Sequence, residues 1–327
     1  MEAQRSSEGA SALKISVIVP LYRSGSTLAR CLRALAQQTR RDFEVLLVDS
    51  SPDLACEVIV QAAQAELPQL VYLRSAQRLL PQPARNLGAA RARGDYLVFS
   101  DPDCYARPDW LERLVAAHED TRQPVVGGLA CHGRRPFDRA VHLCKFSKWL
   151  PAGKAREVDM GPTANLICSR ASFETLGGFQ GDPMVGDALF SWRLRAAGAT
   201  LVFAPDAVVE HHHLDTWKSF LTERFRRGQD FAALRLAWLG ARRPTSFGYL
   251  VVSALPIRLA TNLFHVARHA ARAGATMEFV RGLPVIAVGH AASLAGESVG
   301  YARALRRRSI ATASAPESEV TAAPVVR

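Results

Sequence analysis

The chain has 327 residues, 48% of them hydrophobic and 22% charged, which suffices for one large domain or two smaller ones with a sizeable core. Its net charge of +11 indicates an anionic partner, such as a phosphorylated substrate or an acidic lipid. Only 8% of the residues are aromatic and they form no ladder with basic residues, so nucleic acid is not expected as a partner.

The six cysteines are scattered without a CxxC pair, which indicates buried thiols in a reducing compartment rather than a disulfide framework or a zinc site. Residues 1–13 are polar, and we expect a disordered leader without a signal peptide. No uncharged apolar run reaches the roughly 18 residues of a membrane-spanning helix. These features predict a catalytic domain that works in the cytosol.

The first part of the chain alternates between strands and helices. Continuous apolar runs predict buried strands at 15–20, 43–49, 70–74 and 96–100, and helical patterns occur at 28–38, 53–66, 83–91 and 108–120. This order predicts an α/β fold with a doubly wound, mostly parallel sheet. Ligands bind beyond the carboxyl ends of such strands, where Tyr22, Asp49 and Asp101 lie.

The pattern from 125 to 159 is irregular, and no element is predicted there. A strand at 165–168, helices at 171–177 and 188–197, and short strands at 200–204 and 208–211 follow. The predicted catalytic domain therefore covers residues 14–213.

Residues 214–308 differ in kind and are predicted to associate with a membrane. A basic helix at 215–239 precedes two apolar segments, 248–273 and 282–304, and residues 256–272 form an amphipathic helix with arginines on its polar side. Such a helix suits an anionic membrane surface. The alternative is two helices packed on the catalytic domain. The tail, 309–327, is predicted to be disordered.

The sequence Ser100-Asp101-Pro102-Asp103 follows the fourth predicted strand. Asp101 and Asp103 lie on the same side of an extended chain, and two carboxylates so placed suit a hard divalent cation. An Asp-Pro-Asp turn without a ligand is the alternative. The position at the end of a strand in an open sheet favours the metal.

Three stretches resemble glycosyltransferase family 2, whose members are inverting enzymes of the A-type glycosyltransferase fold. They are ISVIVPLYRSGSTLARCLRALAQQTRRDFEVLLVDSSPD, ARNLGAARARGDYLVFSDPDCYARPDWLE, and NLICSRASFETLGGF followed by GDALFSWRLRAAGATLVFAPDAVVEHHH. They occur in the order of the family's motifs and cover about residues 14–230.

The resemblance implies a nucleoside diphosphate sugar donor and Mn²⁺ or Mg²⁺. It assigns Asp101 and Asp103 to the family's metal-binding DxD motif, with His211 as a further metal ligand. The residues that it assigns to the donor are Pro20, Leu21, Tyr22, Asp49, Arg85, Asn86 and Asp101. Ser50 stands where many members carry a second acid, which leaves open whether the base is uracil, thymine or guanine.

The resemblance also implies that Asp187 is the general base, within a pair whose first residue is Gly186 instead of Glu. A carboxylate there can take the proton of the attacking acceptor hydroxyl. The alternative is that Asp187 caps the following helix. Asn165 matches a position facing the sugar or the acceptor, and Trp192 is assigned to the same group. Arg226 and Arg227 of the basic helix are expected to contact the diphosphate or a lipid phosphate, and a solvated basic face is the alternative.

The helix RFRRGQDFAALR lacks the QxxRW motif of processive members, so a single addition is expected. The sequence thus predicts a metal-dependent inverting glycosyltransferase, docked peripherally on the cytoplasmic face of a membrane. Its expected acceptor is a hydroxyl of a lipid-linked or cell-envelope glycan. A catalytically weakened membrane scaffold and a sugar-1-phosphate nucleotidyltransferase are the alternatives.

Overall fold

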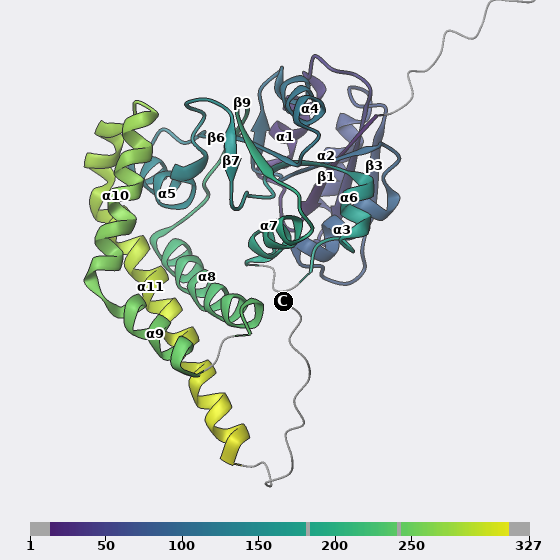
Figure 1. Cartoon of the computed structure of the whole chain (residues 1–327). Coiled ribbons are helices and arrows are strands. Elements are labelled where there is room, and N and C mark those ends of the chain that lie inside the picture. The colour runs from purple at the N-terminus through teal and green to yellow at the C-terminus, as the bar shows by residue number, and fades with distance from the viewer. Residues whose placement is uncertain (1–13, 181–183, 241–242, 314–327) are drawn as a thin grey trace, which may run out of the picture.

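The computed structural model describes residues 14–180, 184–240 and 243–313 (Figure 1). An α/β domain with a central sheet occupies one side, and a group of C-terminal helices, here called the arm, flanks it. The predicted disordered leader and residues 314–327 of the predicted tail lie outside the described residues.

Half of the sheet is the predicted parallel array. Its strands stand in the order β3-β2-β1-β4 and pair with one another in parallel: β1 (Ile15–Leu21), β2 (Phe43–Asp49), β3 (Leu70–Arg74) and β4 (Tyr96–Ser100). Every residue of β1 and β2 is buried, as expected for strands covered on both faces. The α/β fold predicted from the apolar runs is confirmed.

Helices cover both faces of this array, with α1 and α4 on one side and α3 on the other in Figure 1. The first four helices are α1 (Leu28–Ala36), α2 (Ala55–Ala63), α3 (Pro81–Arg91) and α4 (Trp110–Thr121). Gly88 lets α3 pack closely on β1, because a Cβ there would lie 2.6 Å from Ile18. This contact fixes the start of α3 at the carboxyl ends of the strands.

The other half of the sheet is mixed and continues in the order β8-β6-β9-β5. Its strands are β5 (Cys104–Ala106), β6 (Val125–Cys131), β7 (Arg156–Val158), β8 (Asn165–Ser169) and β9 (Leu201–His211). β8 is antiparallel to β4 and β6, β6 and β9 are parallel, and β5 and β7 pair antiparallel with β9.

Two expectations for this half were wrong. The stretch 125–159, expected to be irregular, contains β6, α5 (Pro136–Phe146), the short helix η1 (Ser147–Trp149) and β7. The strands expected at 200–204 and 208–211 form the single strand β9, whose register with β6 shifts between Gly127 and Gly128. A bulge absorbs the extra residues without ending the strand.

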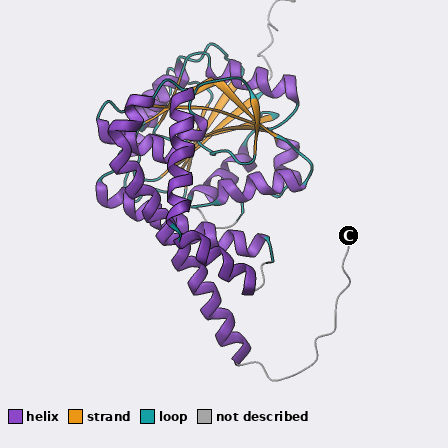
Figure 2. Ribbon diagram, turned by 60° about the vertical axis from the view of Figure 1, so that its left-hand side comes forward, coloured by secondary structure: helices purple, strands orange, loops and turns teal. Residues whose placement is uncertain are grey.

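Two further helices complete the α/β domain: α6 (Arg170–Thr175) and α7 (Gly186–Ala196). The arm consists of α8 (Trp217–Trp238), α9 (Arg243–Ala254), α10 (Pro256–Arg272) and α11 (Thr276–Ala313). In the turned view of Figure 2, helices enclose the orange sheet and the end of the long C-terminal helix projects away from it.

Glycines at spacings of seven residues let α11 approach its neighbours closely. Cβ atoms would lie 2.8 Å from Ala140 of α5 at Gly282, 2.5 Å from Phe220 at Gly289, and 2.0 Å from the Phe225 carbonyl oxygen at Gly296. One face of α11 is therefore packed on α5 and α8.

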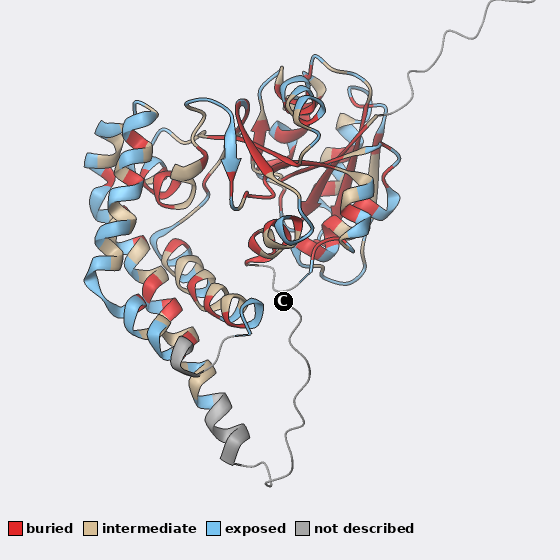
Figure 3. Ribbon diagram, viewed as in Figure 1, coloured by how far each residue is buried: buried red, intermediate tan, exposed pale blue. Residues whose placement is uncertain are grey.

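Over Thr276–Arg306, α11 has the length and apolar composition of a membrane span, although 28% of the apolar window is buried. The pair Phe247–Ala254 and Pro256–Arg272 meets the same test only if counted together, and it bends by 66°. Figure 3 shows that much of the arm's outer surface is exposed. The large apolar side chains exposed there are Phe247, Val251, Val252, Leu255, Ile257, Phe264, Met277, Val280, Leu283 and Val288.

Candidate active site

A cavity of about 380 Å³ opens where β1 and β4 end. Its walls come from the β1–α1 connection, the start of α3, the loop after β4, the start of α7, and α8 of the arm. Of the residues predicted from the sequence, those that line it are Pro20, Leu21, Tyr22, Arg85, Asp101, Asp103, Asp187 and Arg227. Segments up to 207 residues apart in the chain thus meet at one site, where a parallel sheet is expected to bind its ligand.

The two DxD carboxylates have different partners. Asp101 accepts a hydrogen bond from the buried Arg85 guanidinium. Asp103 has no such cation, and burial together with the charge of Asp101 raises the pKa of Asp103 to about 7. Where carboxylates are enclosed and lack a counter-charge, a bound cation stabilises their ionised form.

His211 completes a donor set for a metal ion. Its Nε2 lies 3.8 Å from Oδ2 of Asp103, and its buried Nδ1 has no hydrogen-bond partner among the described residues. Burial lowers the pKa of His211 to about 4, so the imidazole is neutral and free to bind a metal. Cys104 lies beside them, but burial raises its pKa and keeps it a thiol, unsuited to a hard ion. The residues present therefore fit a divalent cation.

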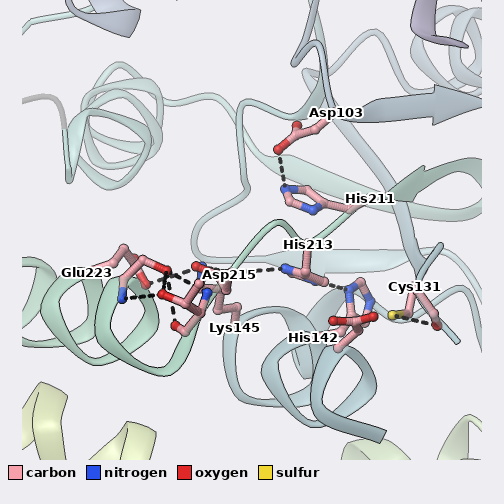
Figure 4. A network of polar contacts seen from close by, with 12 residues as sticks. Asp103, Cys131, His142, Lys145, His211, His213, Asp215 and Glu223 are labelled. Carbon is pink, nitrogen blue, oxygen red and sulfur yellow. Dashed lines mark hydrogen bonds and ion pairs between the residues drawn. The ribbon is translucent and has the colours of Figure 1, made fainter. Parts of the chain in front are cut away.

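A polar network extends from this position toward the arm (Figure 4). His211 stacks on His213, whose Nδ1 lies 3.5 Å from Oδ2 of Asp215. Lys145 Nζ lies 3.0 Å from Asp215 and 3.4 Å from Glu223 of α8. Burial by itself raises the pKa of Asp215. The hydrogen bonds and charges of His213 and Lys145 have the larger effect and lower this pKa to about 2. The sequence analysis missed this network, although the run of three histidines marked one end of it.

Tyr22 forms an exposed platform at the β1 end of the cavity. The guanidinium of Arg78 lies 4.4 Å from the centre of its ring, and that of Arg23 lies 5.6 Å from it. The backbone of Arg23 has φ 54°, held by a hydrogen bond from its N–H to Ser51 Oγ. The Ser50 hydroxyl bonds the carbonyls of Leu21 and Leu79, and so ties two loops of the wall together.

Asp187 lies in the first turn of α7 and points into the cavity. The guanidinium of Arg227 lies 3.2 Å from its Oδ2 and also donates to the carbonyl of Met184. The charge of Asp187 raises the pKa of Arg227. The helix begins at Gly186, before Asp187, and its N-cap is Val185, without a side-chain cap. Asp187 therefore does not fill the capping position that the alternative interpretation gave it, although its Oδ1 accepts from the N–H of Ala188.

The structure explains why residue 186 is a glycine. A Cβ at Gly186 would lie 2.5 Å from Nε2 of Gln82 and 2.8 Å from its Cδ. Gln82 is buried in the cavity wall at the start of α3. The space that a side chain at 186 would need is thus filled by a neutral amide from another helix. No pattern in the sequence indicates this contact between Gly186 and Gln82.

Three predicted site residues lie away from the cavity wall and form hydrogen bonds within the protein. The fully buried Asp49 accepts from Tyr72 Oη at 2.6 Å and from the N–H of Ser51 at 2.8 Å. Asn86 exchanges two hydrogen bonds with the backbone of Phe179. Asn165 accepts from Trp110 Nε1 and donates to two backbone carbonyls, so its amide has no free group for a sugar.

Two more predicted residues, Arg226 of α8 and Trp192 of α7, do not line the cavity. Arg226 is exposed on α8 and does not line the cavity, whereas its neighbour Arg227 does. Trp192 of α7 lines a second hollow of about 540 Å³ with Trp238 and Tyr249. Its ring centre lies 5.8 Å from that of Trp238.

Comparison with known proteins identifies the family of the domain that carries most of this cavity. Residues 16–173 match the family model described as glycosyl transferase family 2. The chain carries a family 2 glycosyltransferase domain. This domain holds the DxD carboxylates and the β8 strand that pairs with β4. The predicted family and a glycosyl transfer enzyme are thereby confirmed.

Curated relatives are named glycosyltransferases or take part in polysaccharide synthesis. Glycosyltransferase AglE of Haloferax volcanii is 27% identical over 219 residues, covering 66% of this chain and 72% of that protein. The succinoglycan biosynthesis protein ExoM of Rhizobium meliloti is 27% identical over 267 residues, covering 74% and 84%. The pre-mycofactocin glycosyltransferase of Mycobacterium tuberculosis is also 27% identical, but the match covers only 52% of its length.

Solved structures of similar fold include two proteins in complex with sugar nucleotides. One is the mannosyltransferase PcManGT from Pyrobaculum calidifontis in complex with GDP-Man and Mn²⁺ (TM-score 0.55, 19% identity, 84% of this chain and 87% of that chain). The other is S. aureus TarS 1–349 in complex with UDP-GlcNAc (TM-score 0.51, 18% identity, 90% and 92%). These likenesses confirm the A-type glycosyltransferase fold of the family 2 domain.

Proposed function

We propose that this glycosyltransferase is a metal-dependent inverting enzyme. It moves one sugar from a nucleoside diphosphate sugar to a hydroxyl of a lipid-linked or cell-envelope glycan. The observation that carries the proposal is the convergence of Asp101 and Asp103 with Asp187 and Arg227 around one cavity. His211 does not line the cavity but lies behind its wall, with Nε2 3.8 Å from Asp103. The GDP-Man, UDP-GlcNAc and Mn²⁺ bound by proteins of similar fold support the donor class and the metal.

The leaving-group half of the site lies at the end of β4. Asp101, Asp103 and His211 would hold Mn²⁺ or Mg²⁺ there, and such an ion neutralises the charge that develops on a departing diphosphate. Arg85 fixes the orientation of Asp101 through their ion pair. The exposed ring of Tyr22, with Arg78 beside it, offers a stacking surface for the nucleoside at the other end of the cavity.

The acceptor half centres on Asp187. The acceptor oxygen attacks the anomeric carbon on the side opposite the diphosphate. The new carbon–oxygen bond forms as the bond to phosphate breaks, and the bonding pair leaves with the diphosphate. The proton of the acceptor hydroxyl passes to the carboxylate of Asp187. The Arg227 guanidinium holds this carboxylate at the cavity wall.

The second hollow supports a glycan as the acceptor. Trp192 lies five residues after Asp187 on α7, which corresponds to about 7.5 Å along a helix. Trp192, Trp238 and Tyr249 supply aromatic faces, and Arg195 and Arg235 supply hydrogen-bond donors. Flat apolar faces with polar groups between them suit the alternating C–H and hydroxyl surfaces of a sugar. A glycan of more than one sugar would extend from Asp187 into this hollow.

The arm supports a location at a membrane surface. Exposed large apolar side chains occur on each of its consecutive helices α9, α10 and α11, and scattered single residues would not give such a group. Arg258, Arg268 and Arg272 add positive charge on α10, which suits anionic lipids. We therefore propose that the enzyme docks peripherally on the cytoplasmic face of a membrane.

A thermal-shift screen of sugar nucleotides with and without Mn²⁺ tests the donor assignment. One class of sugar nucleotide should raise the melting temperature in Mn²⁺, and EDTA should abolish the increase. In Asp103→Ala the metal-dependent increase should disappear, whereas Asp206→Ala, an exposed aspartate in the β9 bulge, should retain it. Retention of the Mn²⁺-dependent increase in Asp103→Ala would contradict the assignment of the metal site.

A further inference from the structure

A third hollow, of about 430 Å³, lies between the α/β domain and α10. One wall is η1 and the loop leading into β7, and the other is the C-terminal end of α10. Phe146 lines the catalytic cavity while the next residue, Ser147, lines this hollow, so the two spaces lie on either side of one turn.

The ionisable groups that line this hollow are all basic: Lys148, Lys154, Arg156, His269 and Arg272. No carboxylate is among the lining residues that the structure describes. The carboxylate of Asp159 lies near Lys148, but its Oδ1 is 2.7 Å from Nη1 of Arg195 outside the hollow. The guanidinium of Arg156 donates to the carbonyl oxygen of Lys148 and lies 4.3 Å from the centre of the Phe203 ring, and no carboxylate of the described residues forms an ion pair with it.

These like charges act on one another. Burial lowers the pKa of Lys148, and burial together with the charge of Arg272 lowers that of Arg156. The pKa of His269 is lowered by burial and then by His265, Arg156 and Arg272. Holding several cations around one hollow costs free energy unless an anion offsets their repulsion.

His269, which lines the hollow, also has a polar atom without a hydrogen-bond partner among the described residues. Nδ1 of His269 is buried and makes no hydrogen bond to any residue that the structure describes. A buried polar atom of this kind is normally satisfied by protein, water or a ligand. Lys148 and His269 form the inner part of the hollow, whereas Lys154, Arg156 and Arg272 are exposed at its rim.

We propose that this hollow is a binding site for a phosphate group, separate from the transfer site. Ammonium and guanidinium donors at the rim would bind the phosphate oxygens, and the imidazole of His269 would reach one of them from inside. The phosphate can belong to a lipid headgroup or to a dissolved phosphate. The inference does not depend on the proposed reaction, because none of these residues lines the catalytic cavity.

Lysine acylation followed by mass spectrometry provides a local test. The chain has two exposed lysines without an ion pair among the described residues: Lys154 at the hollow and Lys218 at the start of α8. Inorganic phosphate, at an ionic strength matched with chloride and in EDTA, should slow the acylation of Lys154 relative to Lys218. Equal effects on both lysines would overturn the proposal.

Charge-removing variants link this protection to the hollow. In Arg272→Gln, phosphate protection of Lys154 should weaken about tenfold, as expected for the loss of one charge-assisted contact. Arg91→Gln removes an exposed charge outside the hollow and should leave the protection unchanged. Without phosphate, the melting temperature of Arg272→Gln should equal or exceed that of the wild type, because repulsion is relieved. Unchanged protection in Arg272→Gln would refute the assignment.

Vesicles distinguish the two sources of phosphate. Phosphatidylcholine vesicles containing phosphatidic acid should protect Lys154 at total phosphate concentrations where dissolved phosphate does not, if the ligand is a lipid headgroup. If the ligand is a dissolved phosphate, inorganic phosphate should protect as well as the vesicles. Both results support the site. Protection of Lys154 by pure phosphatidylcholine vesicles, equal in Arg272→Gln, would contradict it.

Discussion

At the scale of single residues, the carboxylate of Asp187 faces two demands. In the proposed reaction it accepts a proton from the acceptor, and it must also be held in position beside the bound sugar. The ion pair with the Arg227 guanidinium, 3.2 Å away, sets the position of the proposed base at the wall of the cavity. Removing the base and removing its partner should therefore have different effects.

In Asp187→Asn, the shape and hydrogen bonds are nearly kept, but no proton acceptor remains. Turnover should fall by about 10²- to 10⁴-fold, the usual contribution of a general base. The donor-induced thermal shift should persist, since Asp101 and Asp103 are unchanged. Steady-state transfer assays and thermal shifts with the same sugar nucleotide provide the two measurements, and near-normal turnover would refute the base assignment.

Gln82 and Gly186 should be energetically coupled. Gly186→Glu places a Cβ 2.5 Å from the Gln82 amide, so it should destabilise the fold by about 1–3 kcal/mol through overpacking. With Gln82→Ala in the same chain, the added side chain gains space and most of this loss should be recovered. Urea unfolding of the two single variants and the double variant measures the coupling free energy. Strict additivity would show that Gln82 does not restrict residue 186.

The three carboxylates of the proposed site were predicted from the sequence because short motifs carry them. Asp101, Asp103 and Asp187 each follow a recognisable local pattern, and the structure brings all three to one cavity. Asp49 and Asn165 follow equally clear patterns, yet both are buried and bonded within the protein. Gln82, Lys145 and Asp215 were missed, because their roles arise only from contacts between distant segments.

At the scale of elements, the predictable half of the sheet is the parallel one. Strands buried on both faces form nearly continuous apolar runs, so the order of residues along the chain was enough to predict β1, β2 and β4. The mixed half was harder because glycines interrupt β6. The amide of Asn165 and the carbonyl of Ala207 fill the position of a side chain at Gly127, so this glycine is required by packing within a strand. From the sequence alone, it resembles a loop residue.

The glycines of α11 allow a prediction about the arm. Gly296→Ala should destabilise the protein by about 1–3 kcal/mol, because the new methyl group would lie 2.0 Å from the carbonyl oxygen of Phe225. Gly248→Ala on α9 is the matched control. Nothing lies within 4 Å of its Cβ position, so it should be neutral or stabilise the helix by up to about 1 kcal/mol.

Chemical denaturation of both variants measures these changes, with α11 unfolding also followed by hydrogen exchange. Equal stability changes in the two variants would contradict close packing of α11 on α8.

At the scale of the whole molecule, the expected amphipathic helix is only partly directed outward. Val266 and Ala270 of α10 pack into the protein, as the alternative interpretation proposed, while Ile257 and Phe264 are exposed. The apolar side of α10 is therefore divided between the protein core and the surface. This division of the apolar side of α10 could not be inferred from a helical wheel, because it depends on where α5 and α11 lie.

Binding to vesicles tests the proposed docking surface. Ile257→Ser should weaken binding to anionic vesicles, by roughly tenfold if one fully buried aliphatic side chain is lost from the membrane contact. Val58→Ser on α2 has a similar exposure, 65% against 67%, and lies in the α/β domain, so it should have no effect. Sedimentation with phosphatidylglycerol vesicles measures both. Equal weakening by the two variants would argue against docking through the arm.

Arg227 belongs to α8 of the arm, yet its guanidinium holds Asp187 of the α/β domain. The proposed base and its partner both lie outside residues 16–173, the stretch shared with the family model, and they belong to different parts of the fold. A chimaera that joined this α/β domain to the C-terminal region of a relative would inherit a catalytic pair assembled from two sources. The two regions of such enzymes must then diverge together, and exchanging them as independent modules would separate the base from the residue that positions it.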